Sequence, residues 1–182
     1  MESFAIQNRG YSLFEVLLVS AVVVAMGTLA LPLLDASIAQ GRVKTAAYNM
    51  FTDLQYARSA AIAHQQTVVI CPSFDGRQCA RSPQWERGSI LFVDLDHNRM
   101  RSNDEPLLKI RAPLPAGLLL RFRRPNRLYY KPNGSAWPNG HFRVCSTSAA
   151  AQPRSVIIYR TGRNRLSKLA PRRNPFDCPL NS

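Results

Sequence analysis

The chain has 182 residues, of which 46% are hydrophobic and 19% charged, a size that suits one modest domain with an additional element. Its formal net charge is +13, and the charge is unevenly placed. From Lys109 to the C-terminus, fifteen lysines and arginines face a single acid, Asp177, which leaves this part at +14. Such asymmetry indicates an anionic partner: nucleic acid, lipid headgroups or acidic polysaccharide. Arginines outnumber lysines twenty to four. The guanidinium fork suits bidentate phosphate contacts, and the alternative explanation of the excess is a GC-rich genome, which favours arginine codons.

The N-terminal part contains an apolar run from Tyr11 to Leu34 that is interrupted by one charge, Glu15. The run is about as long as the ~20 residues that cross a bilayer. An ionised carboxylate inside such a segment is costly and is usually functional. An ordinary signal peptide would have a small-x-small cleavage site after the apolar run, whereas here the junction between Arg9 and Gly10 precedes it.

These residues resemble the class III signal of type IV pilins and pseudopilins, which has a glycine, an aromatic residue and a glutamate five residues into the mature chain. The resemblance implies cleavage after Gly10 by a prepilin peptidase and N-methylation of the new amine on Tyr11. It also implies a single-pass inner-membrane protein of a Gram-negative bacterium, which then enters a periplasmic or cell-surface pilus beside other pilins. In the filament, the buried charge of Glu15 would meet the N-terminal amine of a neighbouring subunit. The alternative is a plain membrane anchor with a chance glutamate.

One long helix is predicted from about residue 12 to about His64, and Pro32 is expected to kink or loosen it. Beyond Pro32, apolar residues recur at spacings of four and three, which predicts a helix packed through one face. This face comprises Val43, Ala47, Met50, Leu54, Ala57 and Ala61. The charged residues of the segment, including Asp53, are expected to lie mostly outside it. His64 is expected to end the helix, where partial positive charge suits the dipole.

From residue 67 onward the sequence consists of short apolar or alternating runs separated by turn residues. The expected strands are residues 67–71, 89–94, 107–110, 118–122, 128–130, 141–145 and 155–160. Because no helix intervenes, the strands should form antiparallel sheets. The predicted fold class is α+β and type IV pilin-like, with the long N-terminal helix packed on antiparallel β-sheets. The predicted parts are a leader peptide (1–10), the hydrophobic half of the helix (11–34) and a soluble domain (35–182) with a basic C-terminal segment.

Four segments in this order resemble the GspH/FimT family of minor pilins and pseudopilins. They are residues 57–73, Trp85 before residues 88–94, the late strand with Cys145, and residues 156–165. Trp85 and Trp137 are expected to be packing or turn residues rather than stacking platforms.

The four cysteines, Cys71, Cys79, Cys145 and Cys178, allow three pairings. Their spacing does not resemble a zinc site, and no histidine is placed to complete one. Outside the cytoplasm two disulfides are expected. We favour Cys71–Cys79, which closes a small loop, and Cys145–Cys178, which would pin the last residues to a core strand.

One acidic segment has ligand-like spacing: Asp94, Asp96, Asn98 and Glu105 fall at positions 1, 3, 5 and 12 of an EF-hand-type loop. Position 6 should be glycine but is Arg99, and the segment follows a strand rather than a helix. The sequence therefore favours a hairpin with Asx turns over a calcium site, and no cofactor is expected. No nucleophile elbow, P-loop or zinc-protease motif is found, so no enzymatic activity is expected.

The last basic stretch turns at Gly162, whose missing side chain permits a tight turn. Arg163 and Arg165 are two residues apart, so an extended backbone would direct both the same way. Other cations in the segment, with no acid before Asp177, are Arg160, Lys168, Arg172 and Arg173. Residues 162–165 resemble the GRxR signature of FimT-like minor pilins, which implies DNA capture during natural transformation. A solvated hairpin end is the alternative.

The resulting hypothesis is a minor type IV pilin that binds extracellular double-stranded DNA through phosphate contacts, which carry no base code. The rival is a structural minor pseudopilin at the filament tip of a type II secretion system, which binds protein partners only. A third possibility is that the same arginines meet lipopolysaccharide or an anionic membrane surface. A second basic stretch, residues 120–132, places Arg121 and Arg123 on one strand face. It is expected to be a solvated face that could extend the basic surface.

Overall fold

The computed structural model describes residues 11–122, 126–147 and 151–168. Several predicted residues lie outside this part of the chain: Gly10, Arg123, Arg172, Arg173 and Cys178. The chain divides into two compact units, Met1–Ser37 and Ile38–Ser182.

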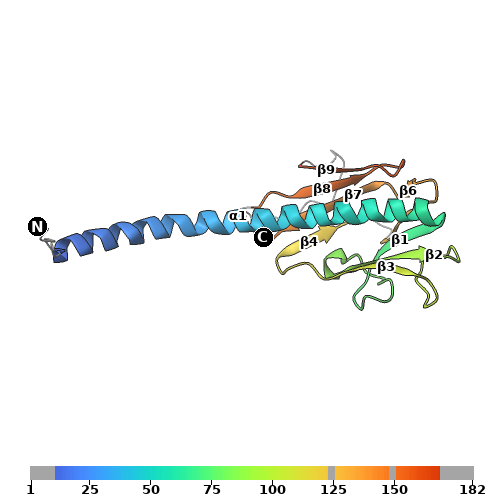
Figure 1. Ribbon diagram of the computed structural model, residues 1–182, viewed down its shortest axis with the longest axis horizontal. Helices are drawn as coiled ribbons and strands as arrows, with labels where there is room; N and C mark the ends of the chain where they lie inside the picture. Colours follow the sequence, from blue (N-terminus) through green and yellow to red (C-terminus); the bar gives the residue numbers. More distant parts are fainter. Residues whose placement is uncertain (1–10, 123–125, 148–150, 169–182) are drawn as a thin grey trace, which may run out of the picture. The chain divides into compact units, whose positions relative to one another are not determined.

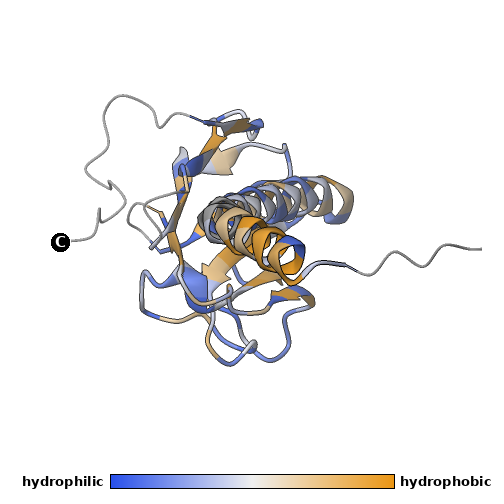
Figure 2. Ribbon diagram, turned by 90° about the vertical axis from the view of Figure 1, so that its left-hand side faces the viewer, coloured by the Kyte–Doolittle hydropathy of each residue, from blue (hydrophilic) through white to orange (hydrophobic). Residues whose placement is uncertain are grey.

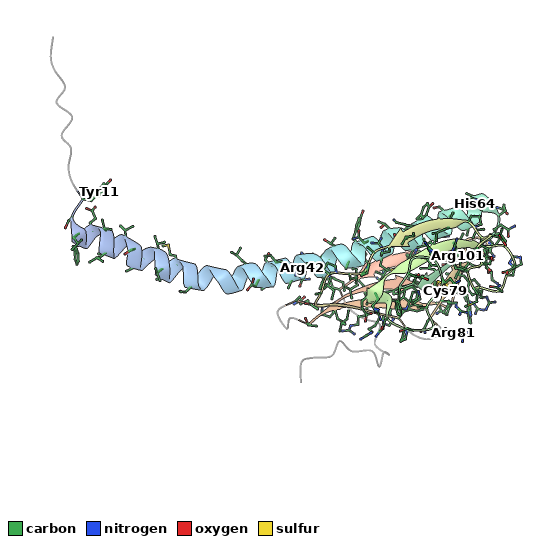
Figure 3. The ribbon with its side chains drawn as sticks, turned by 90° about the horizontal axis from the view of Figure 1, so that it is seen from below. Tyr11, Arg42, His64, Cys79, Arg81 and Arg101 are labelled. Atoms are coloured by element: carbon green, nitrogen blue, oxygen red, sulfur yellow. A yellow bond between two sulfur atoms is a disulfide. The ribbon has the colours of Figure 1, made fainter. Side chains whose placement is uncertain are left out.

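Helix α1 spans Leu13–His64, within one residue of the predicted start, and Glu15 lies exposed in its first turn. It continues through Pro32, so the proline does not end it. Its N-terminal part is strongly hydrophobic (Figure 2), and its C-terminal end at His64 is labelled in Figure 3. Of the described residues, none belongs to a helix long and apolar enough to cross a membrane.

The strands of the second unit form two antiparallel sheets. The five-stranded sheet has the order β3-β2-β1-β5-β6. Its strands are β1 Thr67–Pro72, β2 Ser89–Asp94, β3 Leu107–Arg111, β5 Leu128–Tyr130 and β6 Ala136–Trp137. The four-stranded sheet has the order β4-β7-β8-β9, with β4 Leu118–Arg121, β7 Gly140–Ser146, β8 Arg154–Ile158 and β9 Asn164–Ser167. A short 3₁₀ helix, η1, spans Trp85–Arg87. Strands β8 and β9 lie on one side of α1, and β2 and β3 on the other (Figure 1).

All seven predicted strands are present, and the predicted fold class is confirmed. The two short strands β6 and β9 were not predicted. The expected strand 155–160 instead ends at Ile158, because Tyr159 and Arg160 enter a turn.

The main core lies between α1 and the inner faces of both sheets. All six residues of the predicted helix face are at most 1% exposed. They pack with alternate residues of the strands, among them Val68, Leu91, Phe142 and Val156. Trp85 meets Phe142 edge to face, with ring centroids 4.8 Å apart, so it is a packing residue as predicted. Every buried hydrophobic side chain among the described residues belongs to the second unit, so that unit contains its own core.

Asp53 was expected outside the packed helix face, and this is wrong: its side chain is buried. Lys109 Nζ lies 2.8 Å from Asp53 Oδ1, and Arg111 Nε donates to Asp53 Oδ2. Both cations come from β3 and offset the cost of burying the carboxylate. The ion pairs fasten α1 to the edge of the five-stranded sheet.

The disulfide Cys71–Cys79 is present, with its cysteines eight residues apart, as predicted. Cys145 is also disulfide-bonded. Its expected partner, Cys178, lies outside the described residues.

Candidate nucleic-acid interface

The predicted arginine motif lies in the hairpin that joins β8 to β9, and we refer to residues 159–165 as the arginine turn. Gly162 N donates to Tyr159 O at 2.8 Å, and Tyr159 N donates to Arg163 O at 2.9 Å. Gly162 has a φ of +77°, and a Cβ there would lie 1.7 Å from the carbonyl oxygen of Gly134. Glycine is therefore required both by the left-handed backbone and by the close approach of a second turn.

Arg58 of α1 holds the arginine turn and the neighbouring β5–β6 turn together. Its Nε donates to Gly134 O at 3.1 Å, and its Nη2 donates to Thr161 O at 3.3 Å. Ala136 N also donates to Arg160 O at 3.1 Å. The arginine turn is therefore fixed to a helix and to a second hairpin rather than projecting freely.

Asn164, between the two motif arginines, points into the protein and is only 7% exposed. Tyr130 Oη donates to Asn164 Oδ1 at 2.8 Å, and Asn164 Nδ2 donates to Gln55 Oε1 at 3.2 Å. Burial raises the pKa of Tyr130, so its hydroxyl keeps the proton that it donates. Since successive side chains of an extended segment alternate, the anchored asparagine directs Arg163 and Arg165 outward, and both are exposed.

Four cations of the predicted site are described and exposed: Arg160, Arg163, Arg165 and Lys168. Within the described residues, none of their side chains forms an ion pair or a hydrogen bond. The Arg160 guanidinium lies over the ring of Trp137, 5.3 Å from its centroid. Four uncompensated cations on one hairpin create a local positive potential that favours polyanions.

The outer face of the four-stranded sheet adds three basic side chains from other strands: Arg121, His141 and Arg143. His141 and Arg165 are both paired with Ile157 of β8, and Arg143 is paired with Arg121. Cross-strand partners share a face, and the intervening Phe142 and Val144 are buried.

Sequence reasoning placed Arg121 on a solvated face but did not include His141 or Arg143 in the site. The alternation of buried and half-buried residues in β7 was a visible signal. The pairing that sets β7 beside β8 and β4 cannot be derived from the sequence of β7 alone. Arg121 is partly neutralised, because its Nη1 lies 3.2 Å from Glu86 Oε1.

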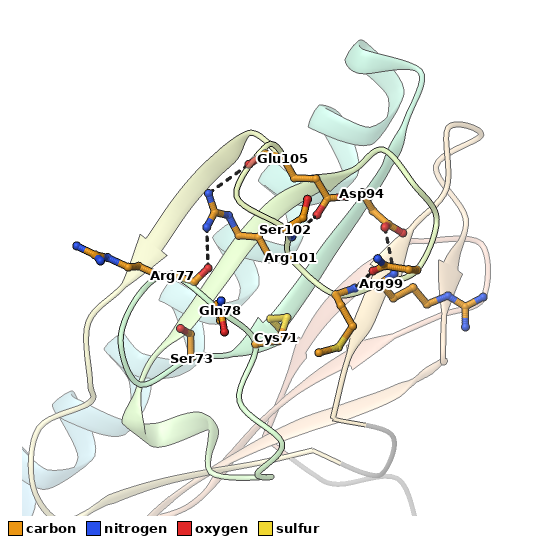
Figure 4. Close-up of a disulfide and its surroundings, with 12 residues drawn as sticks. Cys71, Ser73, Arg77, Gln78, Asp94, Arg99, Arg101, Ser102 and Glu105 are labelled. Carbon is orange, nitrogen blue, oxygen red and sulfur yellow. Dashed lines mark hydrogen bonds between the residues drawn. A yellow bond between two sulfur atoms is a disulfide. The ribbon is translucent and has the colours of Figure 1, made fainter.

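The acidic loop between β2 and β3 brings its three candidate carboxylates together, and Asn98 Nδ2 donates to Asp96 Oδ2 beside them. One carboxylate oxygen from each of Asp94, Asp96 and Glu105 lies within 4.8 Å of the others. Backbone N–H groups donate to each of these carboxylates, Asp96 included. Leu95 N donates to Glu105 Oε1 at 2.8 Å. Arg99 N donates to Asp94 Oδ1 at 3.0 Å, a bond drawn in Figure 4. Burial raises the pKa of Asp94, and the neighbouring negative charges add to the effect.

The same loop forms the Asx turn that its sequence favoured. Asn98 N donates to Asp96 Oδ1 at 3.1 Å. The side chain of Arg99 leaves the carboxylates and lies over Tyr129, 4.5 Å from the ring centroid. The carboxylates therefore serve as acceptors that order the hairpin.

A groove of about 630 Å³ lies between α1 and β9, beside the basic hairpin. Its lining includes the apolar side chains of Tyr48 and Leu166 and the cations Lys44, Arg154 and Lys168. It joins an apolar surface to the positively charged end of β9.

The comparisons with known proteins agree with this architecture. The sequence family described as Type II transport protein GspH matches residues 46–162. The chain is similar in structure to the type IV minor pilin FimU of Pseudomonas aeruginosa, with a TM-score of 0.58 and 22% identity over 72% of this chain and 94% of that chain. It is also similar to the minor pseudopilin EpsH from the type 2 secretion system of Vibrio cholerae, with a TM-score of 0.46 and 16% identity over 72% and 99% of the chains. No curated protein sequence matches the chain.

The family match covers more than half of the chain, from α1 to Gly162. Arg163 and Arg165 lie just beyond its last residue, so the match carries no information about them. The similarity to FimU shows the fold. The chain therefore belongs to the GspH family and has the fold seen in FimU.

Proposed function

We propose that this chain is a minor type IV pilin that binds extracellular double-stranded DNA non-specifically, through the arginine turn, during natural transformation. The observation that carries the proposal is the anchoring of Asn164 by Tyr130 and Gln55. It holds Arg163 and Arg165 outward on a fixed backbone, where neither has a side-chain partner among the described residues.

Phosphate recognition suits this geometry for two reasons. Cations without protein partners do not need to break an ion pair before they bind DNA, and a rigid backbone limits the ordering cost on binding. Arginine also binds phosphate with two parallel N–H groups. Contacts to phosphates carry no sequence information, which fits uptake of DNA of any sequence. Arg160 and Lys168 would extend the contact, and we assign the same role to Arg172 and Arg173.

The N-terminal part supports assembly with other pilins. Apolar side chains of the first unit, such as Phe14, Val16 and Leu17, are exposed, and a surface of this kind needs a cover. We infer that the inner membrane covers it before assembly and that other pilins cover it afterwards. Cleavage after Gly10 by a prepilin peptidase and N-methylation of Tyr11 would produce the amine that meets Glu15 of a neighbouring subunit.

The proposal is tested with residues 38–182, which contain the whole described core. The double variant Arg163→Gln/Arg165→Gln should lose a gel shift of duplex DNA and keep its melting temperature. The control Arg77→Gln/Arg81→Gln removes the same charge from exposed arginines near the disulfide, and it should bind as the wild type does. Undiminished binding by Arg163→Gln/Arg165→Gln would exclude this site.

The groove between α1 and β9 favours a second candidate, a structural pseudopilin that binds protein partners only. That function predicts no duplex binding at physiological salt and a loss of protein secretion when the gene is deleted. The third possible ligand is lipopolysaccharide or an anionic membrane surface. A DNA gel shift that lipopolysaccharide competes away, together with binding of the protein to anionic vesicles, would favour that ligand over DNA.

A further inference from the structure

Trp137 and Arg160 form a stacked pair at the edge of the arginine turn. Trp137, in β6, is 42% exposed. The sequence favoured a packing or turn residue over a stacking platform at this position, and the contacts of the exposed ring lead to a different inference. The Arg160 guanidinium lies 5.3 Å from the Trp137 ring centroid, within the range of a cation–π contact. The hydrogen bond from Ala136 N to Arg160 O fixes the two backbones beside each other.

The pair is one end of a longer row, in which two neighbouring aromatic residues, Trp137 and Tyr129, lie between the cations Arg160 and Arg99. Trp137 is the cross-strand partner of Tyr129, so the two rings share one face of the sheet. Arg99 covers Tyr129 at 4.5 Å from its centroid. At the other end of this row, Arg99 belongs to the acidic loop that contains Asp94 and its neighbouring carboxylates, whose negative charges repel phosphate. Only the Trp137 end combines an exposed ring with uncompensated cations.

Cation–aromatic stacking alone is not unusual in this protein, and a second pair provides the comparison. Arg87 lies over Phe74, 4.1 Å from the ring centroid, and Phe74 is 44% exposed. Phe74 lies two residues beyond the end of β1 at Pro72. Trp137 lies in β6, which pairs with β5, and β5 pairs with the first half of β1. The Phe74 pair therefore has the same chemistry without the arginine turn beside it.

We propose that Trp137 and Arg160 stack on an unpaired base while the arginine turn binds phosphates of the same strand, so that the site prefers single-stranded or frayed DNA to blunt duplex. This inference rests on the proposed DNA-binding function. Aromatic rings and guanidinium planes stack on any base, because every base has a π-face. Bases inside a duplex stack on each other, so only unpaired bases can reach Trp137.

Tryptophan fluorescence gives a direct test, because the chain has two tryptophans and Trp85 is only 1% exposed. Residues 38–182 are titrated with a short oligothymidylate and with a blunt DNA hairpin of equal charge. We expect oligothymidylate to quench the tryptophan fluorescence more strongly than the blunt hairpin does, and to bind more tightly. Trp137→Ala should lose about tenfold in affinity for oligothymidylate, Trp137→Phe should retain most of it, and Phe74→Ala should bind like the wild type.

Unchanged oligothymidylate affinity in Trp137→Ala, measured by anisotropy with an unchanged melting temperature, would overturn the stacking site. If Arg163→Gln/Arg165→Gln still lost duplex binding in that case, the proposed function would stand without it. Absence of all DNA binding by the wild type at low salt would overturn both. Quenching by an acidic oligosaccharide but not by oligothymidylate would reassign Trp137 to a carbohydrate and also overturn the inference.

Discussion

The salt dependence expected of the proposed DNA binding follows from the exposed cations of the basic hairpin. Four described cations form no ion pair or side-chain hydrogen bond among the described residues and can each meet a phosphate: Arg160, Arg163, Arg165 and Lys168. Each neutralised phosphate contributes about −0.9 to the slope of log K against log salt, so four give about −3.6. Affinity should then fall about 150-fold between about 50 and 200 mM salt.

The variant Arg163→Gln/Arg165→Gln leaves two of these contacts, so its slope should be about −1.8 and its affinity should fall only about twelvefold over the same range. Fluorescence anisotropy of a labelled blunt duplex measures the slope at several salt concentrations. The charge-matched variant Arg77→Gln/Arg81→Gln should keep the wild-type slope, because it changes the net charge without touching the turn.

Two results would refute this reasoning. An unchanged slope in Arg163→Gln/Arg165→Gln would mean that the turn does not contact phosphates. Equal flattening in both double variants would mean that DNA responds to the net charge of the protein rather than to a located site.

Three further predictions concern the support of the site and the disulfide loop. Replacing Gly162 with alanine should lower the free energy of unfolding in urea by about 2 kcal/mol or more, because the new Cβ would lie 1.7 Å from a carbonyl oxygen; wild-type stability would show that the two turns separate easily. Tyr130→Phe leaves a buried amide oxygen without its donor and should cost about 1–2 kcal/mol, and an unchanged melting temperature would contradict the anchoring. Backbone N–H groups of Gln78 and Arg77 lower the pKa of Asp75 from 3.8 to about 2. The ionised Asp75 carboxylate therefore stabilises the fold above about pH 4, and this stabilisation is lost as pH falls towards 2. The free energies of unfolding in urea of the wild type and of Asp75→Asn should converge over that interval. A difference between the two that stays constant with pH would disprove the assignment.

The packed face of α1 could be predicted because helical periodicity is a local signal. Residues such as Met50 and Leu54 recur at the spacing of one helix face, and all are buried. Asp53 could not be placed in the same way, because its partner Arg111 is 58 residues away and belongs to β3. The sequence shows that Asp53 carries a charge that is costly to bury. It does not show which distant cation offsets that cost.

In the arginine turn, too, some features could be predicted from the sequence and others could not. Gly162 and the alternation of Arg163 and Arg165 were readable from residue chemistry. Strand β9 was not, because Asn164–Ser167 is polar and basic and is a strand only through its pairing with β8. The position of Trp137 likewise depends on strand pairing, with Tyr129 across the β5–β6 hairpin.

Arg58 has a mechanical consequence for the proposed function. Its guanidinium joins α1 to carbonyl oxygens of both turns, six residues before the helix ends at His64. If the arginine turn binds DNA as proposed, tension on that DNA would reach the helix through this guanidinium as well as along β8 and β9. Load shared between parallel attachments lets the turn keep its shape under a force that would peel a free hairpin from its sheet.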